Sequence, residues 1–276
     1  MFKSNKTQKD ENFPVASWLI QPSIRKHINA FYLCVRSADD IADSVELAPA
    51  EKKYILKKID AALIGEQDND KRLQYAIQHR KSAEETGVSI EYARHLVQAF
   101  NMDITKLRYR NWSELINYCR FSAVPVGRYL LELHGCNMDP RNSTDSLCIA
   151  LQILNHLQDA KEDYLKLNRV YIPERIFQKH NAKVEDLGRK SAHDNLREVI
   201  DSVLNRVDEL IVIASKAPKE IPHFGLRLET AIIISIAKKL TTKLKQHDPI
   251  SKKVSLTKFQ YFLCCIKGII RGILKT

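Results

Sequence analysis

Glycine and proline are scarce in this chain, whose 276 residues include only 8 Gly and 9 Pro. These two residues mark most turns and breaks, so the segments between them must be long, which favours helices. No alternation of Val, Ile or Thr is long enough to predict a sheet. No fixed-period repeat and no clear linker are present. We therefore expect an all-α protein, folded as one domain over residues 1–276.

Long apolar stretches are also missing. No uninterrupted run approaches the roughly 20 apolar residues that span a bilayer, and residues 1–14 lack the apolar core of a signal peptide. The six cysteines form no Cys-x-x-Cys pair, which argues against zinc and against a disulfide framework. We expect reduced thiols in a cytoplasmic protein, with at most a peripheral contact at the inner membrane surface.

Basic side chains outnumber acidic ones by 44 to 33, a net charge of +11. Such an excess is typical of proteins that meet nucleic acid, an anionic membrane surface or a phosphorylated substrate. No basic run is interleaved with aromatic residues, so we expect no nucleic-acid partner. Much of the excess lies in "KKLTTKLK" and "SKKVSLTK", which we expect to lie far from the acidic segments described below.

Capping and breaking residues divide the chain into expected helices. Residues 1–22 predict an extended lead-in, and Ser23 then caps a long helix that includes the segment "CVRSADDIADS". A second helix opens at Pro49 and stops at Gly65. The clearest helix is "DSLCIALQILNHLQDAKEDYLKL", residues 145–167.

Two further segments carry a specific expectation each. Residues 111–135 are helical with a break or kink near Pro125–Gly127. The C-terminal segment 256–276 is apolar with spaced Lys267, Arg271 and Lys275. It is either a buried final helix or an interfacial helix that docks at anionic lipid.

Two acidic segments lie within otherwise apolar helical sequence. On a helix, positions i, i+4, i+7 and i+11 share one face. In the first segment this face carries Tyr32, Arg36, Asp39 and Asp43, with Asp40 beside them. In the second segment the stripe, at i, i+3, i+7 and i+11, consists of Gln152, Asn155, Asp159 and Asp163.

Two carboxylate-bearing faces that both point inward would repel each other unless a cation lay between them. Magnesium prefers oxygen ligands and is commonly shared between carboxylates and substrate phosphates. We therefore predict a helical cavity in which Mg²⁺ is held by Asp39, Asp43, Asn155, Asp159 and Asp163. The alternative is two solvated acidic faces that pair with the many lysines.

The segments "FYLCVRSADDIAD" and "QILNHLQDAKEDYLKLNRVYIP" resemble the two signature segments of the squalene/phytoene synthase family. The family motifs D-D-x-x-D and D-x-x-E/D-D match Asp39, Asp40 and Asp43, and Asp159, Glu162 and Asp163. The resemblance covers nearly the whole chain. It implies a class I terpenoid synthase fold, a single-domain helical bundle around a central cavity, and dependence on two or three Mg²⁺ ions.

Within the family, "ENFPVASWL", "DITKLRY" and "YCRFSAVPVGRYLLELHG" most resemble the bacterial hydroxysqualene synthase branch, found beside hopanoid biosynthesis enzymes. The resemblance implies conversion of presqualene diphosphate and water to hydroxysqualene, with the substrate supplied by a sister presqualene diphosphate synthase. Many family members have arginine where this chain has Gln158, and the loss of that diphosphate contact fits a partial reaction. The alternatives are head-to-head condensation of two prenyl diphosphates, such as farnesyl diphosphate, to presqualene diphosphate, squalene or phytoene, and a non-catalytic scaffold.

The resemblance also assigns roles to individual residues. Those expected to take part in catalysis are Asp39, Asp40, Asp43, Asp159, Asp163 and Tyr32. Those expected to bind substrate are Arg36, Gln152, Asn155, Arg108, Arg169, Tyr171, Phe31 and Tyr118. The arginines would stabilise the departing diphosphate, and Phe31 and Tyr118 would line an apolar tunnel that shields a carbocation. Tyr171 is open to a packing role as well, and His156 is expected to be structural.

Overall fold

The computed structural model describes residues 21–66, 70–136 and 141–275, so the expected lead-in of residues 1–22 lies almost wholly outside the described residues. The described residues form helices, with no strand among them and an isolated bridge between Arg108 and Val170. The all-α prediction is confirmed. Within this part of the chain, no helix combines the length and the apolar character that a membrane span requires.

The chain divides into two compact units, and each is described by itself. Unit 1 contains residues up to 105 together with residues 121–137, and unit 2 contains residues 106–120 and those from 138 onward. The expectation that residues 1–276 form one domain stays a prediction.

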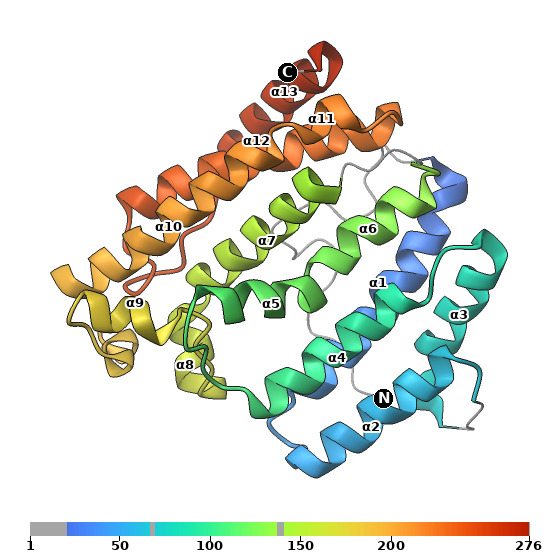
Figure 1. The fold of residues 1–276 in the computed structure, drawn as a ribbon, viewed down its shortest axis with the longest axis horizontal. Helices are drawn as coiled ribbons and strands as arrows, with labels where there is room; N and C mark the ends of the chain where they lie inside the picture. The colour runs from blue at the N-terminus through green and yellow to red at the C-terminus, as the bar shows by residue number, and fades with distance from the viewer. Residues whose placement is uncertain (1–20, 67–69, 137–140, 276) are drawn as a thin grey trace. The chain divides into compact units, whose positions relative to one another are not determined.

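Unit 1 is a cluster of helices around α1 (Pro22–Asp43). This helix packs against α2 (Pro49–Leu63), α3 (Gln74–Thr86) and α4 (Glu91–Thr105), and α6 (Val124–Leu133) packs against α4 (Figure 1). A short 3₁₀ turn, η2 (Lys71–Leu73), precedes α3. In the core the Phe31 ring stacks on the Tyr129 ring, with 4.0 Å between centroids and 8° between planes.

Most helix ends in unit 1 follow from local sequence, but the expected cap at Ser23 is wrong, because α1 begins at Pro22 and its N-cap is Gln21. Pro22 and Pro49 lie in the first turns of α1 and α2, where a missing N–H costs no hydrogen bond. Gly65 follows α2 with φ 101°, a backbone conformation that favours glycine. The break expected near Pro125 occurs at Ala123, with φ −131°. Pro125 lies in the first turn of α6, because proline fits a helix start better than a helix interior.

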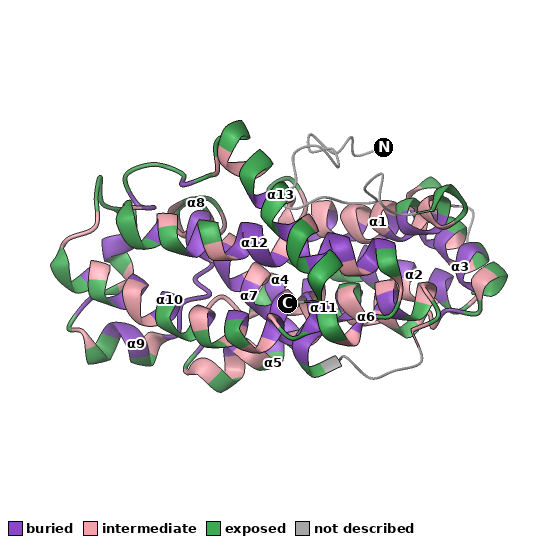
Figure 2. Ribbon diagram, turned by 90° about the horizontal axis from the view of Figure 1, so that it is seen from above, coloured by how far each residue is buried: buried purple, intermediate pink, exposed green. Residues whose placement is uncertain are grey.

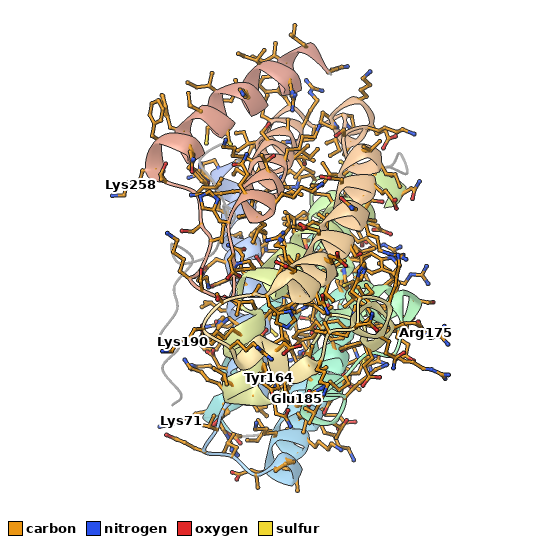
Figure 3. The ribbon with its side chains drawn as sticks, turned by 90° about the vertical axis from the view of Figure 1, so that its left-hand side faces the viewer. Lys71, Tyr164, Arg175, Glu185, Lys190 and Lys258 are labelled. Atoms are coloured by element: carbon orange, nitrogen blue, oxygen red, sulfur yellow. The ribbon has the colours of Figure 1, made fainter. Side chains whose placement is uncertain are left out.

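Unit 2 is built around α7 (Arg141–Gln158), α10 (Asp194–Ala214) and α12 (Phe224–Gln246). The helix α10 packs against both α7 and α12, and α13 (Lys258–Leu274) packs along α12 (Figure 1). Figure 2 shows α12 as mainly buried and α13 as mainly exposed. The shorter elements are α5 (Trp112–Ser122, of which residues 112–120 belong to this unit), α8 (Ala160–Leu167), α9 (Glu174–Lys179), η3 (Val184–Gly188) and α11 (Ala217–Glu220). In Figure 3, Tyr164 and Glu185 are labelled where α8 lies against η3.

Candidate functional site

The first acidic segment forms the last two turns of α1. Arg36 donates to Asp39 and to Asp40, with nitrogen–oxygen distances of 2.8 Å and 2.5 Å. Both pairs are one helical turn apart, the spacing at which side chains on a helix meet. All three side chains are partly buried. The guanidinium expected to meet a diphosphate therefore already neutralises part of the acidic segment.

Asp39 lies in surroundings that disfavour its charged form. Burial, and to a smaller extent the nearby carboxylate of Asp43, raises the pKa of this carboxyl from 3.8 to about 7, against the opposing effect of Arg36. Asp103 and Asp40 add smaller increases in the same direction. A carboxyl crowded by other carboxylates gains stability when a cation joins it. The cluster therefore has the charge that a divalent ion would neutralise.

Asp103 is a member of this cluster that the sequence interpretation missed. It lies on α4, is buried, and acts on Asp39 through its charge. A signal for it exists in the sequence, because Leu96, Phe100 and Asp103 occupy one apolar stripe of that helix. A carboxylate on a buried stripe needs a polar or charged neighbour. The carboxyl on which Asp103 acts, that of Asp39, lies on α1, more than 60 residues away in the chain, so the sequence alone could not name it.

The second acidic segment is confirmed as helical but is not one continuous helix. The expected helix 145–167 bends at Asp159, where α7 ends and α8 begins. Hydrogen bonds still run through the bend: the N–H of Asp159 donates to the carbonyl of Asn155 at 3.0 Å, and the N–H of Asp163 donates to that of Asp159 at 2.8 Å. Asn155, Asp159 and Asp163 therefore follow one another turn by turn on the same face, as their spacing predicted.

Residues 248–257 lie against the second acidic segment. The amide nitrogen of Gln158 donates to the carbonyl of Val254 at 2.6 Å, and Lys161 donates to the carbonyl of Ile250 at 3.1 Å. Lys253 donates to a carboxylate oxygen of Asp159. The expectation that the lysines of "SKKVSLTK" lie far from the acidic segments is therefore wrong for Lys253. The loop returns to this place because Gln158 is buried and holds it there.

Four rings and a buried arginine form an aromatic cluster in unit 2. The His156 ring stacks on the Tyr171 ring, with 3.5 Å between centroids and 13° between planes. The centroids of the Tyr118 and Tyr109 rings lie 5.3 Å and 5.7 Å from the centroid of Tyr171. Burial, and to a smaller extent the charge of Arg169, lowers the pKa of His156 to about 3. The histidine is therefore neutral near pH 7, in agreement with its expected structural role.

Two of the expected substrate-binding residues from this region are held in protein contacts. Arg108 donates to the side-chain oxygen of Asn168 at 2.7 Å and to its backbone carbonyl. Tyr171 is buried in the aromatic cluster. These contacts give both residues a structural role, and their contact with a diphosphate stays a prediction.

The remaining predicted residues are distributed over both units. Phe31 is buried in the core of unit 1, and Tyr118 is buried in the aromatic cluster of unit 2. Tyr32 on α1 and Gln152 on α7 are partly buried. Asp39, Asp40 and Asp43 belong to unit 1, whereas Asn155, Asp159 and Asp163 belong to unit 2. Their meeting across a cavity stays a prediction.

The donor sets fit a hard divalent cation by their chemistry. Each acidic segment offers carboxylate oxygens on one helical face, the second adds the amide oxygen of Asn155, and Mg²⁺ prefers such ligands. Among the residues that the structure describes, however, no three His, Cys, Asp or Glu side chains are gathered tightly enough to hold a metal ion. A complete set of ligands therefore needs oxygens from elsewhere, such as a substrate phosphate.

Comparison with known proteins decides the family. A family model described as squalene/phytoene synthase matches residues 6–260. The chain belongs to this family. It is 39% identical to a hydroxysqualene synthase of Sinorhizobium fredii and 40% identical to one of Rhodopseudomonas palustris, in each case over 95% of this chain and 88% of the relative. A crystal structure of a squalene synthase from Alicyclobacillus acidocaldarius matches with a TM-score of 0.73 and 25% identity, over 84% of this chain and 87% of that one.

Membership of the squalene/phytoene synthase family confirms the expected fold and enzyme class, and supports the expected metal and substrate at the level of the family. The fold is that of the class I terpenoid synthases. The chain is an enzyme of the prenyl-diphosphate synthase type, so the non-catalytic alternative is not supported. The family generally uses a divalent metal and acts on prenyl diphosphates.

Proposed function

We propose that this member of the squalene/phytoene synthase family converts presqualene diphosphate and water to hydroxysqualene and diphosphate. The observation that carries the proposal is the identity of 39–40% to two hydroxysqualene synthases over 95% of the chain. Both acidic motifs are complete, which fits a working enzyme. A sister presqualene diphosphate synthase would supply the substrate.

In the proposed reaction the carbon–oxygen bond to the diphosphate breaks, and the leaving group takes both electrons. The carbocation rearranges, a water oxygen attacks it, and a proton is lost to give the alcohol. Asp39, Asp43, Asn155, Asp159 and Asp163 would hold two or three Mg²⁺ ions. When bound, such ions neutralise the charge that develops on a departing diphosphate.

The side chains of this protein have distinct tasks in the proposal. Arg36 holds Asp39 and Asp40 in place through its two hydrogen bonds. The carboxyl of Asp39, with its raised pKa, must give up its proton before it can bind a cation. Apolar walls that include Phe31 and Tyr118 would exclude water from the cation until rearrangement is complete.

Product analysis of the purified enzyme tests this proposal. The enzyme is incubated with Mg²⁺ and either presqualene diphosphate or farnesyl diphosphate, and the lipid extract is analysed by mass spectrometry. We expect hydroxysqualene from presqualene diphosphate and no product from farnesyl diphosphate alone. Consumption of farnesyl diphosphate alone would instead favour head-to-head condensation to presqualene diphosphate, squalene or phytoene.

Matched variants identify the groups that act. Asp39→Asn and Asp159→Asn remove one carboxylate from each motif without changing side-chain size, and each should lower kcat/KM by at least about 100-fold. Glu209→Gln removes an exposed carboxylate from α10 and serves as the control, with activity unchanged. Wild-type activity in the two motif variants would contradict the proposal.

A further inference from the structure

The C-terminal helix α13 packs against α12 through its smallest residues. Cys264, Gly268 and Gly272 form its buried face. A Cβ atom added to Gly268 would lie 2.3 Å from the Cα of Ile232, and one added to Gly272 would lie 2.7 Å from a methyl carbon of Leu228. Only glycine allows so close an approach of two helices. The side of α13 that faces α12 is therefore fixed by packing.

The large apolar residues of α13 lie on the opposite, exposed side. At 100° per residue they fall within an arc of about 120°. We call this set the apolar stripe; its members are Phe259, Phe262, Leu263, Ile266, Ile270, Ile273 and Leu274. Phe259 is 69% exposed and Leu274 is 64% exposed. A contiguous apolar surface of this kind marks an interaction site, because water contact with it is unfavourable.

Positive charge borders the apolar stripe. Lys267 and Arg271 are exposed on one side of it and Lys258 on the other, and Figure 3 shows Lys258 at the start of α13, directed away from the helices. Residues 238–276 contain ten Lys and Arg against a single acidic residue, Asp248. This stretch, which includes the apolar stripe, therefore carries most of the net charge of the chain.

We propose that α13 docks the enzyme on an anionic lipid surface. The helix would lie in the plane of the headgroups with the apolar stripe among the upper acyl chains and Lys258, Lys267 and Arg271 near lipid phosphates. A second copy of the chain is a poorer occupant. Symmetric packing of α13 on its own copy would place its basic border against the same basic border, with no acidic residue in the helix to pair with.

The docking proposal does not rest on the proposed reaction, and its test needs no turnover. The full-length enzyme is sedimented with vesicles of equal parts phosphatidylglycerol and phosphatidylcholine, and with vesicles of phosphatidylcholine alone. We expect binding to the anionic vesicles that weakens as salt is raised, and at least about tenfold weaker binding to the neutral ones.

Two variants and one control assign the binding to α13. Ile266→Gln with Ile270→Gln removes apolar area, and Lys267→Glu with Arg271→Glu reverses two charges. Each pair should weaken binding to anionic vesicles by about tenfold or more. Val212→Gln with Ile64→Gln alters two exposed apolar residues outside α13 and should change binding less than about twofold. All these positions are exposed, so the fold should survive, and circular dichroism checks this.

Three outcomes would overturn the proposal. The first is no binding of the wild-type enzyme to anionic vesicles at low salt. The second is binding that both α13 variants leave unchanged. The third is a dimer, detected by light scattering, that Ile266→Gln with Ile270→Gln dissociates while vesicle binding persists. The last result would assign the apolar stripe to contact between copies of the chain.

Discussion

Burial and the neighbouring carboxylates both raise the pKa of Asp39. Its pKa of about 7 means that half of these carboxyls keep a proton near neutral pH when no cation is bound. Asp43 and Asp103 contribute to this increase, while Arg36 opposes it. The ordinary reason to keep such an unfavourable group in a fold is function, because strongly shifted pKa values gather at binding and catalytic sites.

The raised pKa of Asp39 predicts how stability depends on pH and on Mg²⁺. The folded-state value, about 7, lies above the ordinary value of 3.8. The contribution of this group to stability is therefore complete below pH 3.8 and is lost as the pH rises through 7. From pH 6 to pH 8 the loss is about 1 kcal/mol. A bound divalent cation would offset it, so Mg²⁺ should stabilise the fold more at pH 8 than at pH 6.

Thermal unfolding with and without Mg²⁺ at the two pH values measures this effect. The increase in Tm caused by Mg²⁺ should be about 2–4 °C greater at pH 8. The difference should vanish in Asp39→Asn, which cannot ionise, and should shrink in Asp103→Asn, which removes one source of repulsion. An equal Mg²⁺ effect at both pH values in the wild-type enzyme would contradict the prediction.

Among the helices, the junction of α7 and α8 shows how one side chain positions a whole segment. The buried amide of Gln158 holds the carbonyl of Val254, and this contact brings Lys253 to Asp159. The structure therefore gives this glutamine a hydrogen-bonding task of its own. A buried arginine would need a new partner for its charge at that position.

Substitution of Gln158 should therefore loosen residues 248–257. Gln158→Leu leaves the carbonyl of Val254 without its donor in a buried place and should cost about 1–3 kcal/mol of unfolding free energy. Gln158→Arg should cost at least as much, because it buries a charge. Gln178→Leu, at an exposed position on α9, is the control and should stay within about 0.5 kcal/mol.

Urea unfolding measures the loss of stability, and limited trypsin digestion reports on the loop. Cleavage after Lys252 or Lys253 should be faster in both Gln158 variants than in the wild-type enzyme and in the control. If Gln158→Arg is as stable in urea and as resistant to trypsin as the wild-type enzyme, the prediction that the glutamine positions this loop is wrong.

For the molecule as a whole, the central prediction is that the two acidic segments serve one diphosphate. One segment belongs to unit 1 and the other to unit 2. Residues that act on the same transition state give strongly non-additive losses, whereas residues that act independently give losses that multiply. A double-mutant cycle therefore tests cooperation between the units without any assumption about distance.

The cycle uses Asp43→Asn from unit 1 and Asp163→Asn from unit 2. Each single variant should lower kcat/KM for diphosphate release by at least about 100-fold. The kcat/KM of the double variant should lie within about tenfold of that of the less active single variant, because loss of either segment already disables the shared site. Losses that multiply would instead indicate two independent sites.

Helix positions and the motif spacing were accessible from the residues alone, because they depend on short-range chemistry. Pro49 opens α2 and Gly65 follows its end, as their backbone preferences require. The spacing of Asn155, Asp159 and Asp163 places them on one face even though the helix bends between them. The exact position of the breaks, at Ala123 and Asp159, and the N-cap of α1, which is Gln21 and not Ser23, differed from expectation.

Contacts between distant segments were not accessible in the same way. The nearness of Asp103 to Asp39, and of Lys253 to Asp159, depends on which helices and loops pack together. The orientation of α13 also depends on such packing: its apolar composition suited a buried helix and an interfacial helix equally. Gly268 and Gly272 against α12 direct the apolar stripe outward, since the close approach of two helices leaves room for small residues alone.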